Sequence, residues 1–555
     1  MAQRAPCTRI PPVTSTPPVA ESTPPKRPGT LRSLGHAMAS WRTASVTLLS
    51  FSSGLPFALV LTAIPDWMRR IGMDIRVVGL ITLAQAPWTF KFLWSPLMDR
   101  FVPPWLGRLG RRRGWAAVAQ VALFALTLGL AGVGSHPDTP WVVAALAFAI
   151  AFAGASQDIA IDAYAVDVLE PEEQAVAVGA RNAVYRSAMY IVGGLGITLA
   201  GRYSWPLVNA FLACLYLPML FLTARAPEPR EVVVAPRSLR EAAWYPFVGF
   251  LSRHRALGIL AFLLLYKLAD NLAQALQRPF LVDMGYSDFD RGVALATVGL
   301  FGSLFGVFLG GVLTEVIGLG RALWIFGFLQ TFASLGYVLL AALGGVHRSL
   351  MYGAIGFEVL SAGLGSGAFS VLLLRLTQRR FSATQYALFS SLFGLPRLVA
   401  GPVCGFAVYA IGWYKFFWLT ILAGIPGMIM LSRFVPFGAR EPILALDQPE
   451  RLAPLSKGQL AARGIAGTAV GAAVAVFIAA LLPALRTAKE HPGTAVDLTP
   501  PLTALAHPQG AGWLTLLGIA TFAAVCGLFT AAVAAARHGA GQEIGLEEAP
   551  ESAKL

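Results

Sequence analysis

Two carboxylates stand four residues apart within a long apolar stretch of the chain. Asp158 and Asp162 belong to the segment 141–166, and this spacing puts both side chains on one face of a helix. Two buried acids so close together are not expected to ionise freely at once, so one of them could carry a proton. Glu358, in the apolar segment 349–374, is a second candidate of this kind. The alternative is that these acids are structural and bind neighbouring basic residues.

The apolar segment 256–278 contains a stripe of polar residues. They recur at steps of three and four, which places most of them on one helix face: Lys267, Asp270, Asn271, Gln274, Gln277 and Arg278. A lipid-facing stripe of this kind would be unstable, so we expect it to line a water-filled cavity. There Lys267, Asp270, Asn271 and Gln274 could bind a polar substrate, and Asp270 is a further candidate for the proton carrier. A simple Lys267–Asp270 pair is the alternative.

Two arginines hold equivalent places in two similar parts of the chain. At an offset of 211 residues, Arg186 matches Arg397, and four further positions agree: Gln174 with Gln385, Gly194 with Gly405, Gly201 with Gly412, and Tyr203 with Tyr414. A guanidinium binds a carboxylate through two parallel hydrogen bonds, so such a pair suits an anionic substrate. Alternatively, each arginine neutralises an acid of its own half. Arg181 lies closer to the end of its segment and is interpreted as an edge residue.

A loop after the segment 77–97 combines one acid with several basic residues: Asp99, Arg100, Arg108, Arg111, Arg112 and Arg113. Carboxylates favour helix N-termini and cations favour C-termini, so this loop could lock one face of the molecule and release it on opening. At an offset of 216 residues, Glu315 matches Asp99, and Arg321 follows a glycine as Arg108 does. The alternative is that the charges only keep the loop on the cytoplasmic side.

Lys91 is counted with these gate residues, although it lies within the segment 77–97. It stands at a depth similar to that of Asp158 and Asp162 and could neutralise either. An unpaired lysine at that depth would be costly, so we expect a partner for it.

The composition places all of these residues in a membrane. Of the 555 residues, 56% are hydrophobic and 13% are charged, which is about half the share typical of soluble domains. These values exclude a soluble enzyme, a disordered protein and a disulfide scaffold. The net charge of +14 is divided among short clusters between apolar runs, so nucleic acid is not an expected partner. The four cysteines are far apart and form no metal motif, so no metal and no cofactor is expected.

Fourteen apolar segments are candidate membrane spans: 44–64, 77–97, 115–134, 141–166, 175–200, 205–224, 256–278, 291–314, 321–343, 349–374, 383–411, 413–432, 462–485 and 512–535. The count of six, six and two, together with the repeat, predicts an all-α polytopic membrane protein. We expect a major facilitator fold of two six-helix halves plus two extra C-terminal helices. Arginine-rich loops on one side predict that both termini are cytoplasmic.

The predicted organisation has seven parts. In order, they are a disordered cytoplasmic tail (1–42), an N-terminal six-helix half (43–225), a cytoplasmic central loop (226–255), a C-terminal six-helix half (256–433), a cytoplasmic linker (434–460), two accessory transmembrane helices (461–536) and a cytoplasmic tail (537–555).

Several longer motifs carry a family resemblance. They are Lys91-Phe-Leu-Trp-Ser-Pro-Leu-Met-Asp-Arg100, Gly110-Arg-Arg-Arg-Gly-Trp115, Ala155-Ser-Gln-Asp-Ile-Ala-Ile-Asp162, Leu265-Tyr-Lys-Leu-Ala-Asp270, Arg321-Ala-Leu-Trp-Ile-Phe-Gly-Phe-Leu-Gln330 and Phe381-Ser-Ala-Thr-Gln-Tyr-Ala387. Between about residues 44 and 432 the chain resembles the AmpG muropeptide permeases. The long proline-rich N-terminal tail departs from the usual pattern of that family.

The resemblance implies import of N-acetylglucosaminyl-1,6-anhydro-N-acetylmuramyl peptides from periplasm to cytoplasm, driven by the proton gradient across a bacterial inner membrane. It also implies a role in peptidoglycan recycling and, in many bacteria, in β-lactamase induction. Gln157 and Tyr190 join Arg186, Arg397 and the stripe as candidates for binding the substrate. The expected partners are the muropeptide, protons and lipid, and a monomer is expected.

Two alternatives remain at this point. One is a relative that carries a nucleotide-linked acyl donor such as acetyl-CoA, because that family shares a similar Ser-Gln-Asp-Ile motif. The other is a membrane sensor of wall fragments that moves no substrate. An enzyme is not expected, since the sequence has neither a P-loop glycine-lysine motif nor HExxH.

Overall fold

The structure is a computed structural model. It describes residues 39–71, 84, 86–103, 105–134, 140–229, 236, 238–252, 256–433, 435–442, 455–490, 496–510 and 512–538. The expected N-terminal tail 1–42 lies almost wholly outside this range, as do residues 539–555 and part of the expected span 77–97.

The described part of the first half is built from helices joined by short connections. Its elements are α2 (Trp41–Ala58), η1 (Leu59–Ala63), α3 (Ile64–Arg70), α5 (Ala86–Phe90), η3 (Lys91–Leu93), α6 (Ser95–Arg100), η4 (Gly107–Leu109), α7 (Arg111–Gly132), α8 (Pro140–Val168), α9 (Pro171–Tyr190), η5 (Ile191–Gly196), α10 (Ile197–Arg202), α11 (Trp205–Cys214) and α12 (Tyr216–Arg225). Helices suit these apolar sequences because lipid offers no partners to the backbone, which must therefore bond within each segment.

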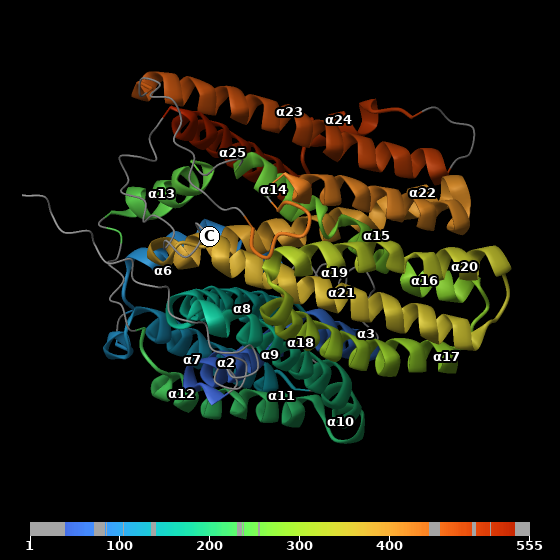
Figure 1. Cartoon of the computed structure of the whole chain (residues 1–555), viewed down its shortest axis with the longest axis horizontal. Helices are drawn as coiled ribbons and strands as arrows, with labels where there is room; N and C mark the ends of the chain where they lie inside the picture. The colour runs from blue at the N-terminus through green and yellow to red at the C-terminus, as the bar shows by residue number, and fades with distance from the viewer. Residues whose placement is uncertain are drawn as a thin grey trace, which may run out of the picture.

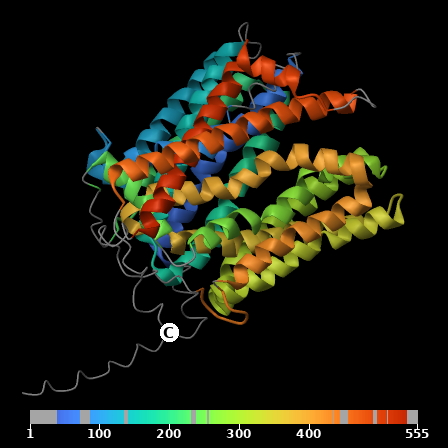
Figure 2. The same cartoon turned by 90° about the horizontal axis from the view of Figure 1, so that it is seen from above.

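The rest of the described chain is helical as well. The central loop holds α13 (Leu239–Leu251), and the second half holds α14 (Ala256–Leu265), α15 (Leu268–Ala275), α16 (Gln277–Asp283), α17 (Asp288–Gly292), η6 (Val293–Val298), α18 (Gly299–Ile317), α19 (Leu319–Ala333), α20 (Leu335–Leu343), α21 (Arg348–Leu376), η7 (Arg379–Phe381) and α22 (Ser382–Ser432). The accessory part holds α23 (Lys457–Glu490), α24 (Thr499–Ala506) and α25 (Gly512–Arg537). The long helices run roughly along the longest axis of the molecule (Figures 1 and 2).

Within the described residues, 12 helices are long and apolar enough to cross a membrane. The expectation of fourteen spans is therefore not confirmed. The expected span 77–97 is only partly described, and its described part is divided among the short elements α5, η3 and α6. The expected span 383–411 is helical, but it forms the first part of α22, which continues to Ser432. The two parts of α22 meet at Gly412, whose φ of 75° breaks the helical geometry.

The two halves contact each other closely where α9 crosses α18. A Cβ atom added to Gly179 would lie 2.7 Å from the carbonyl oxygen of Phe308, and one added to Gly311 would lie 2.8 Å from the Cα of Gly179. Larger side chains would push the helices apart, so these two glycines set the approach of the halves.

The central-loop helix α13 joins the accessory helices to the bundle. Ser238 caps its N-terminus by accepting a hydrogen bond from the Glu241 amide at 3.1 Å. Val248 of α13 packs against three alanines of α25, which are Ala532, Ala535 and Ala536. On its other side α13 contacts the start of α22, because Gln385 donates to the Pro246 carbonyl at 3.0 Å and the rings of Phe250 and Phe389 lie 4.8 Å apart. In Figure 1, α23 and α25 lie along one side of the molecule.

Candidate functional site

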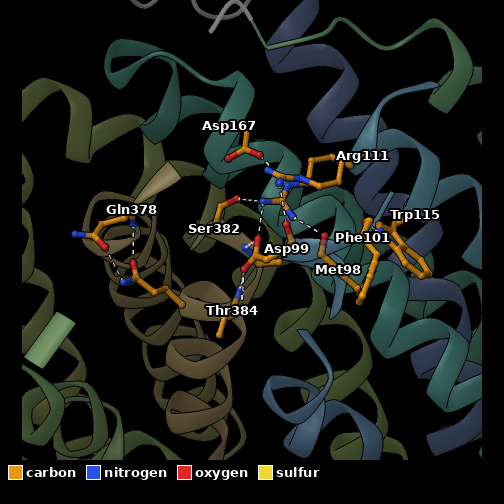
Figure 3. A network of polar contacts seen from close by, with 12 residues as sticks. Met98, Asp99, Phe101, Arg111, Trp115, Asp167, Gln378, Ser382 and Thr384 are labelled. Carbon is orange, nitrogen blue, oxygen red and sulfur yellow. Dashed lines mark hydrogen bonds and ion pairs between the residues drawn. The ribbon is translucent and has the colours of Figure 1, made fainter. Parts of the chain in front are cut away.

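A buried charge network lies at the end of the bundle that carries Arg108, Arg111, Arg112 and Arg113, which we call the arginine-rich end (Figure 3). Its centre is Arg112, at the start of α7. The guanidinium donates to Asp99 at 2.7 Å and to Asp167 at 2.8 Å. All three side chains are buried, and the two carboxylates compensate the desolvated cation.

The same network connects the two halves. Asp99, from α6 of the first half, accepts from the backbone amides of Ala383 and Thr384 at 3.2 and 2.8 Å, and from the Thr384 hydroxyl at 2.6 Å. Arg112 also donates to the Ser382 hydroxyl at 2.7 Å. These three partners form the first turn of α22, where unpaired amides and the helix dipole favour an anion. The geometry holds the two halves together at this end.

The remaining loop arginines lie around this centre. Arg111 donates to the Asp99 carbonyl at 2.8 Å, and Arg113 donates to the Ala226 carbonyl at 2.6 Å and pairs with Glu228. Arg100 lies over the Phe101 ring, 5.4 Å from its centroid, and Arg108 is exposed. Of the predicted gate loop, Asp99 and Arg112 therefore make the side-chain contacts to the second half, while Arg111 supports the loop.

The second copy of the loop is built differently. Arg321 donates to the Gly438 carbonyl at 3.0 Å, and Glu315 is half-buried at the end of α18. By the 211-residue offset, Glu173 of α9 stands where Thr384 stands in α22. The N-terminus of α9 already carries a capping box of Glu170 and Glu173. A carboxylate from Glu315 would meet like charge there.

The two acids of α8 have different partners. Asp162 faces two cations, because Lys91 lies 3.1 Å away and Arg181 also pairs with it. Asp158 accepts from the Trp88 indole at 3.0 Å through one carboxylate oxygen, and its other oxygen is buried without a hydrogen-bond partner. Lys91 thus belongs to this cluster and not to the gate network. Arg181 also belongs to this cluster, although the sequence analysis interpreted it as an edge residue. Its position five residues before Arg186 did not indicate that it would pair with Asp162.

The polar stripe of α15 forms a connected cluster in the second half. Lys267 pairs with Asp270 at 3.1 Å and donates to the Ala362 carbonyl at 2.8 Å. Gln274 donates to both Asp270 and Glu358 at 2.9 Å, which links the stripe to α21. The Tyr337 hydroxyl donates to a carboxylate oxygen of Glu358 at 3.4 Å. The Lys267–Asp270 pair, named above as the alternative, is present and belongs to a wider network.

Arg186 bridges the halves, because its guanidinium donates to the Ser303 hydroxyl of α18. Asn182, one turn earlier on α9, donates to Ser370 of α21 at 3.4 Å. Gln157 donates to Ser53 at 3.5 Å within the first half. Two other substrate candidates take no part in the contacts above: Asn271 is half-buried, and Tyr190 is exposed at the end of α9. The side chain of Arg397 lies outside the described residues.

The comparisons with known proteins agree on the type of fold. The model of the Major Facilitator Superfamily matches residues 46–401. The anhydromuropeptide permease of Escherichia coli K12 is 38% identical over 392 residues, which are 70% of this chain and 79% of that protein. A protein of Haemophilus influenzae is 35% identical over 399 residues, with 70% of this chain and 92% of that protein covered. The solved structure of the proton:xylose symporter XylE has a TM-score of 0.54 at 13% identity, covering 71% of this chain and 96% of that one, which shows a shared fold.

Proposed function

Because this chain belongs to the Major Facilitator Superfamily and to the AmpG permease family within it, we propose that it imports anhydro-muropeptides together with protons. The observation that carries the proposal is the 38% identity with the Escherichia coli anhydromuropeptide permease over most of both chains. The membership also identifies the chain as a transporter and not an enzyme.

The proposed orientation puts the arginine-rich end in the cytoplasm of a bacterium, with the chain in the inner membrane and both termini inside. The positive-inside rule supports this, because Arg108 and Arg111 to Arg113 lie beside the ends of spans. Transport then runs from periplasm to cytoplasm by alternating access, with the halves rocking against each other around α9 and α18. The network of Asp99 and Arg112 with α22 is the inner gate, and it must break for the substrate to leave.

The substrate is held by side chains of both halves. Anhydro-muropeptides carry stem-peptide carboxylates, which suit the fork of Arg186 at the contact of α9 with α18. Lys267, Asp270 and Gln274 of the second half supply donors and acceptors for sugar hydroxyls and peptide groups. A substrate carboxylate that replaced Ser303 as a partner of Arg186 would couple binding to the separation of the two halves at that point.

The proton is carried by an acid that has no cation bound to it. Asp162 and Asp270 are paired with lysine. Asp158 accepts from the Trp88 indole, and Glu358 interacts with Gln274, Tyr337 and the Asp270 carboxyl, none of which is a cation. A buried carboxyl without a cation favours its neutral, protonated form. Asp158 and Glu358 are therefore the proposed carriers, one in each half.

The test is uptake into proteoliposomes that contain the purified full chain. An imposed inward proton gradient should accumulate labelled anhydro-muropeptide, and a protonophore should abolish the accumulation. Three results would contradict the proposal: accumulation that ignores the gradient, binding without accumulation as a sensor would show, or uptake of acetyl-CoA instead of the muropeptide.

A further inference from the structure

An apolar groove of about 250 Å³ lies on the surface of the second half, between α19 and the last part of α22. Trp324, Phe328 and Phe332 follow one another at steps of four along α19 and form one wall. Ile425 and Ile429 form the other wall on α22. The side chains of Phe328, Phe332, Ile425 and Ile429 are all exposed, between 40% and 52%, so the groove opens outward and not into the bundle.

The floor of the groove is fixed by close packing of the two helices. A Cβ on Gly327 would lie 2.7 Å from the sulfur of Met428, and one on Gly424 would lie 2.7 Å from Thr331. These glycines let α19 and α22 approach closely, while the larger side chains on either side project outward. The groove therefore follows from the close approach of this helix pair at Gly327 and Gly424.

Each of the two helices carries an arginine at the same end of the groove. Arg321 precedes Trp324 by three residues on α19, and Arg433 follows Ile429 by four at the end of α22, so each lies on the face of its own wall. Both are exposed. The ends of the two helices lie together, because the Trp324 indole donates to the Val435 carbonyl and Arg321 donates to Gly438, both at 3.0 Å. A guanidinium has five N–H donors, and this bond of Arg321 uses one of them.

We propose that this groove binds an anionic phospholipid, with an acyl chain between the walls and the phosphate at Arg321 and Arg433. The apolar channel accepts a hydrocarbon chain, and the two guanidiniums complement the negative head group at the level where the span meets water. The groove faces outward, away from the proposed substrate contacts. The orientation proposed above would put its arginine end at the inner leaflet, and this assignment rests on the proposed function.

Native mass spectrometry of the full chain in detergent measures the binding directly, with phosphatidylglycerol and phosphatidylethanolamine offered as the lipids. The chain should retain phosphatidylglycerol in preference. The double variant Arg321→Gln/Arg433→Gln should weaken that retention roughly 30-fold, because each arginine near an anionic head group contributes independently. Ile429→Trp should fill the groove and remove the lipid with both arginines intact.

Matched controls lie on α12 of the first half. Arg225 ends α12 as Arg433 follows α22, and Leu217 is an exposed apolar residue of α12. Arg225→Gln and Leu217→Trp should leave the retained lipid unchanged. Equal retention of both lipids by the unmodified chain, full retention by the double variant, or cross-linking of two copies through a cysteine at Phe328 would each overturn the proposal. Uptake measured on Ile429→Trp separates this site from the transport function, since Ile429 lies outside both the proposed path and the predicted gate.

Discussion

Replacing Asp99 by asparagine should open the arginine-rich end. Asp99 is fully buried and accepts three hydrogen bonds from the first turn of α22. Asparagine has nearly the same shape, but it carries no charge and turns one acceptor oxygen into an NH₂ group that faces donors. Hydrogen bonds to a charged group contribute about 1.5–3 kcal/mol each. The variant loses one or two such bonds, so the closed state should lose about 3 kcal/mol, or roughly 100-fold in the equilibrium.

The Arg112 guanidinium limits the damage to the fold. It also pairs with Asp167 at 2.8 Å, and both residues belong to the first half, so this pair should persist in the variant and in the closed and open states. The lost free energy therefore comes mainly from the contact between the two halves. Spin labels at the exposed positions Arg108 and Phe437, in a chain whose native cysteines are replaced, should report a new population at longer distance in pulsed electron-spin measurements.

Glu315→Gln is the matched control, because Glu315 is the repeat counterpart of Asp99, whereas the position equivalent to Thr384 at the start of α9 is the capping residue Glu173. Its effect should stay within about 0.5 kcal/mol. An unchanged distance distribution in Asp99→Asn would refute the reasoning. An equal opening by Glu315→Gln would show that loss of negative charge at this end, and not the contact with α22, controls the equilibrium.

Three further predictions concern the transport path. Asp158→Asn should lower gradient-driven uptake in proteoliposomes while substrate exchange continues, because one of the two proposed carriers is lost but the path is kept; normal driven uptake would rule out Asp158. Arg186→Lys should raise the substrate concentration for half-maximal uptake about 10-fold, since a lysine lacks the bidentate fork; a variant with unchanged affinity for the anionic muropeptide would exclude the assigned role. Gly311→Leu should slow exchange and uptake alike by separating α9 from α18, and Gly292→Leu, where an added Cβ meets nothing within 4 Å, should not.

Helical periodicity predicted which polar residues share one helix face, but it did not predict their partners on other helices. The stripe at Lys267, Asp270 and Gln274 was recognisable because helical periodicity alone puts its members on one face, and the structure links them in one network. The connection to Glu358 was not predictable, since it depends on how α21 packs beside α15. Lys91 was expected to need a partner, but its choice of Asp162 over Asp158 follows from the packing of η3 against α8.

The amino-acid sequence by itself determined the class of protein and its family. Apolar segments of spanning length, positive charge between them and an internal repeat follow from local physical constraints, because lipid demands satisfied backbones and few charges. Only the tertiary structure decided which charges neutralise one another. It brings Asp99 to the first turn of α22, 284 residues away, and gives Arg181 to Asp162. Those pairings depend on how the helices pack against one another, and the spacing of residues along one helix does not determine that packing.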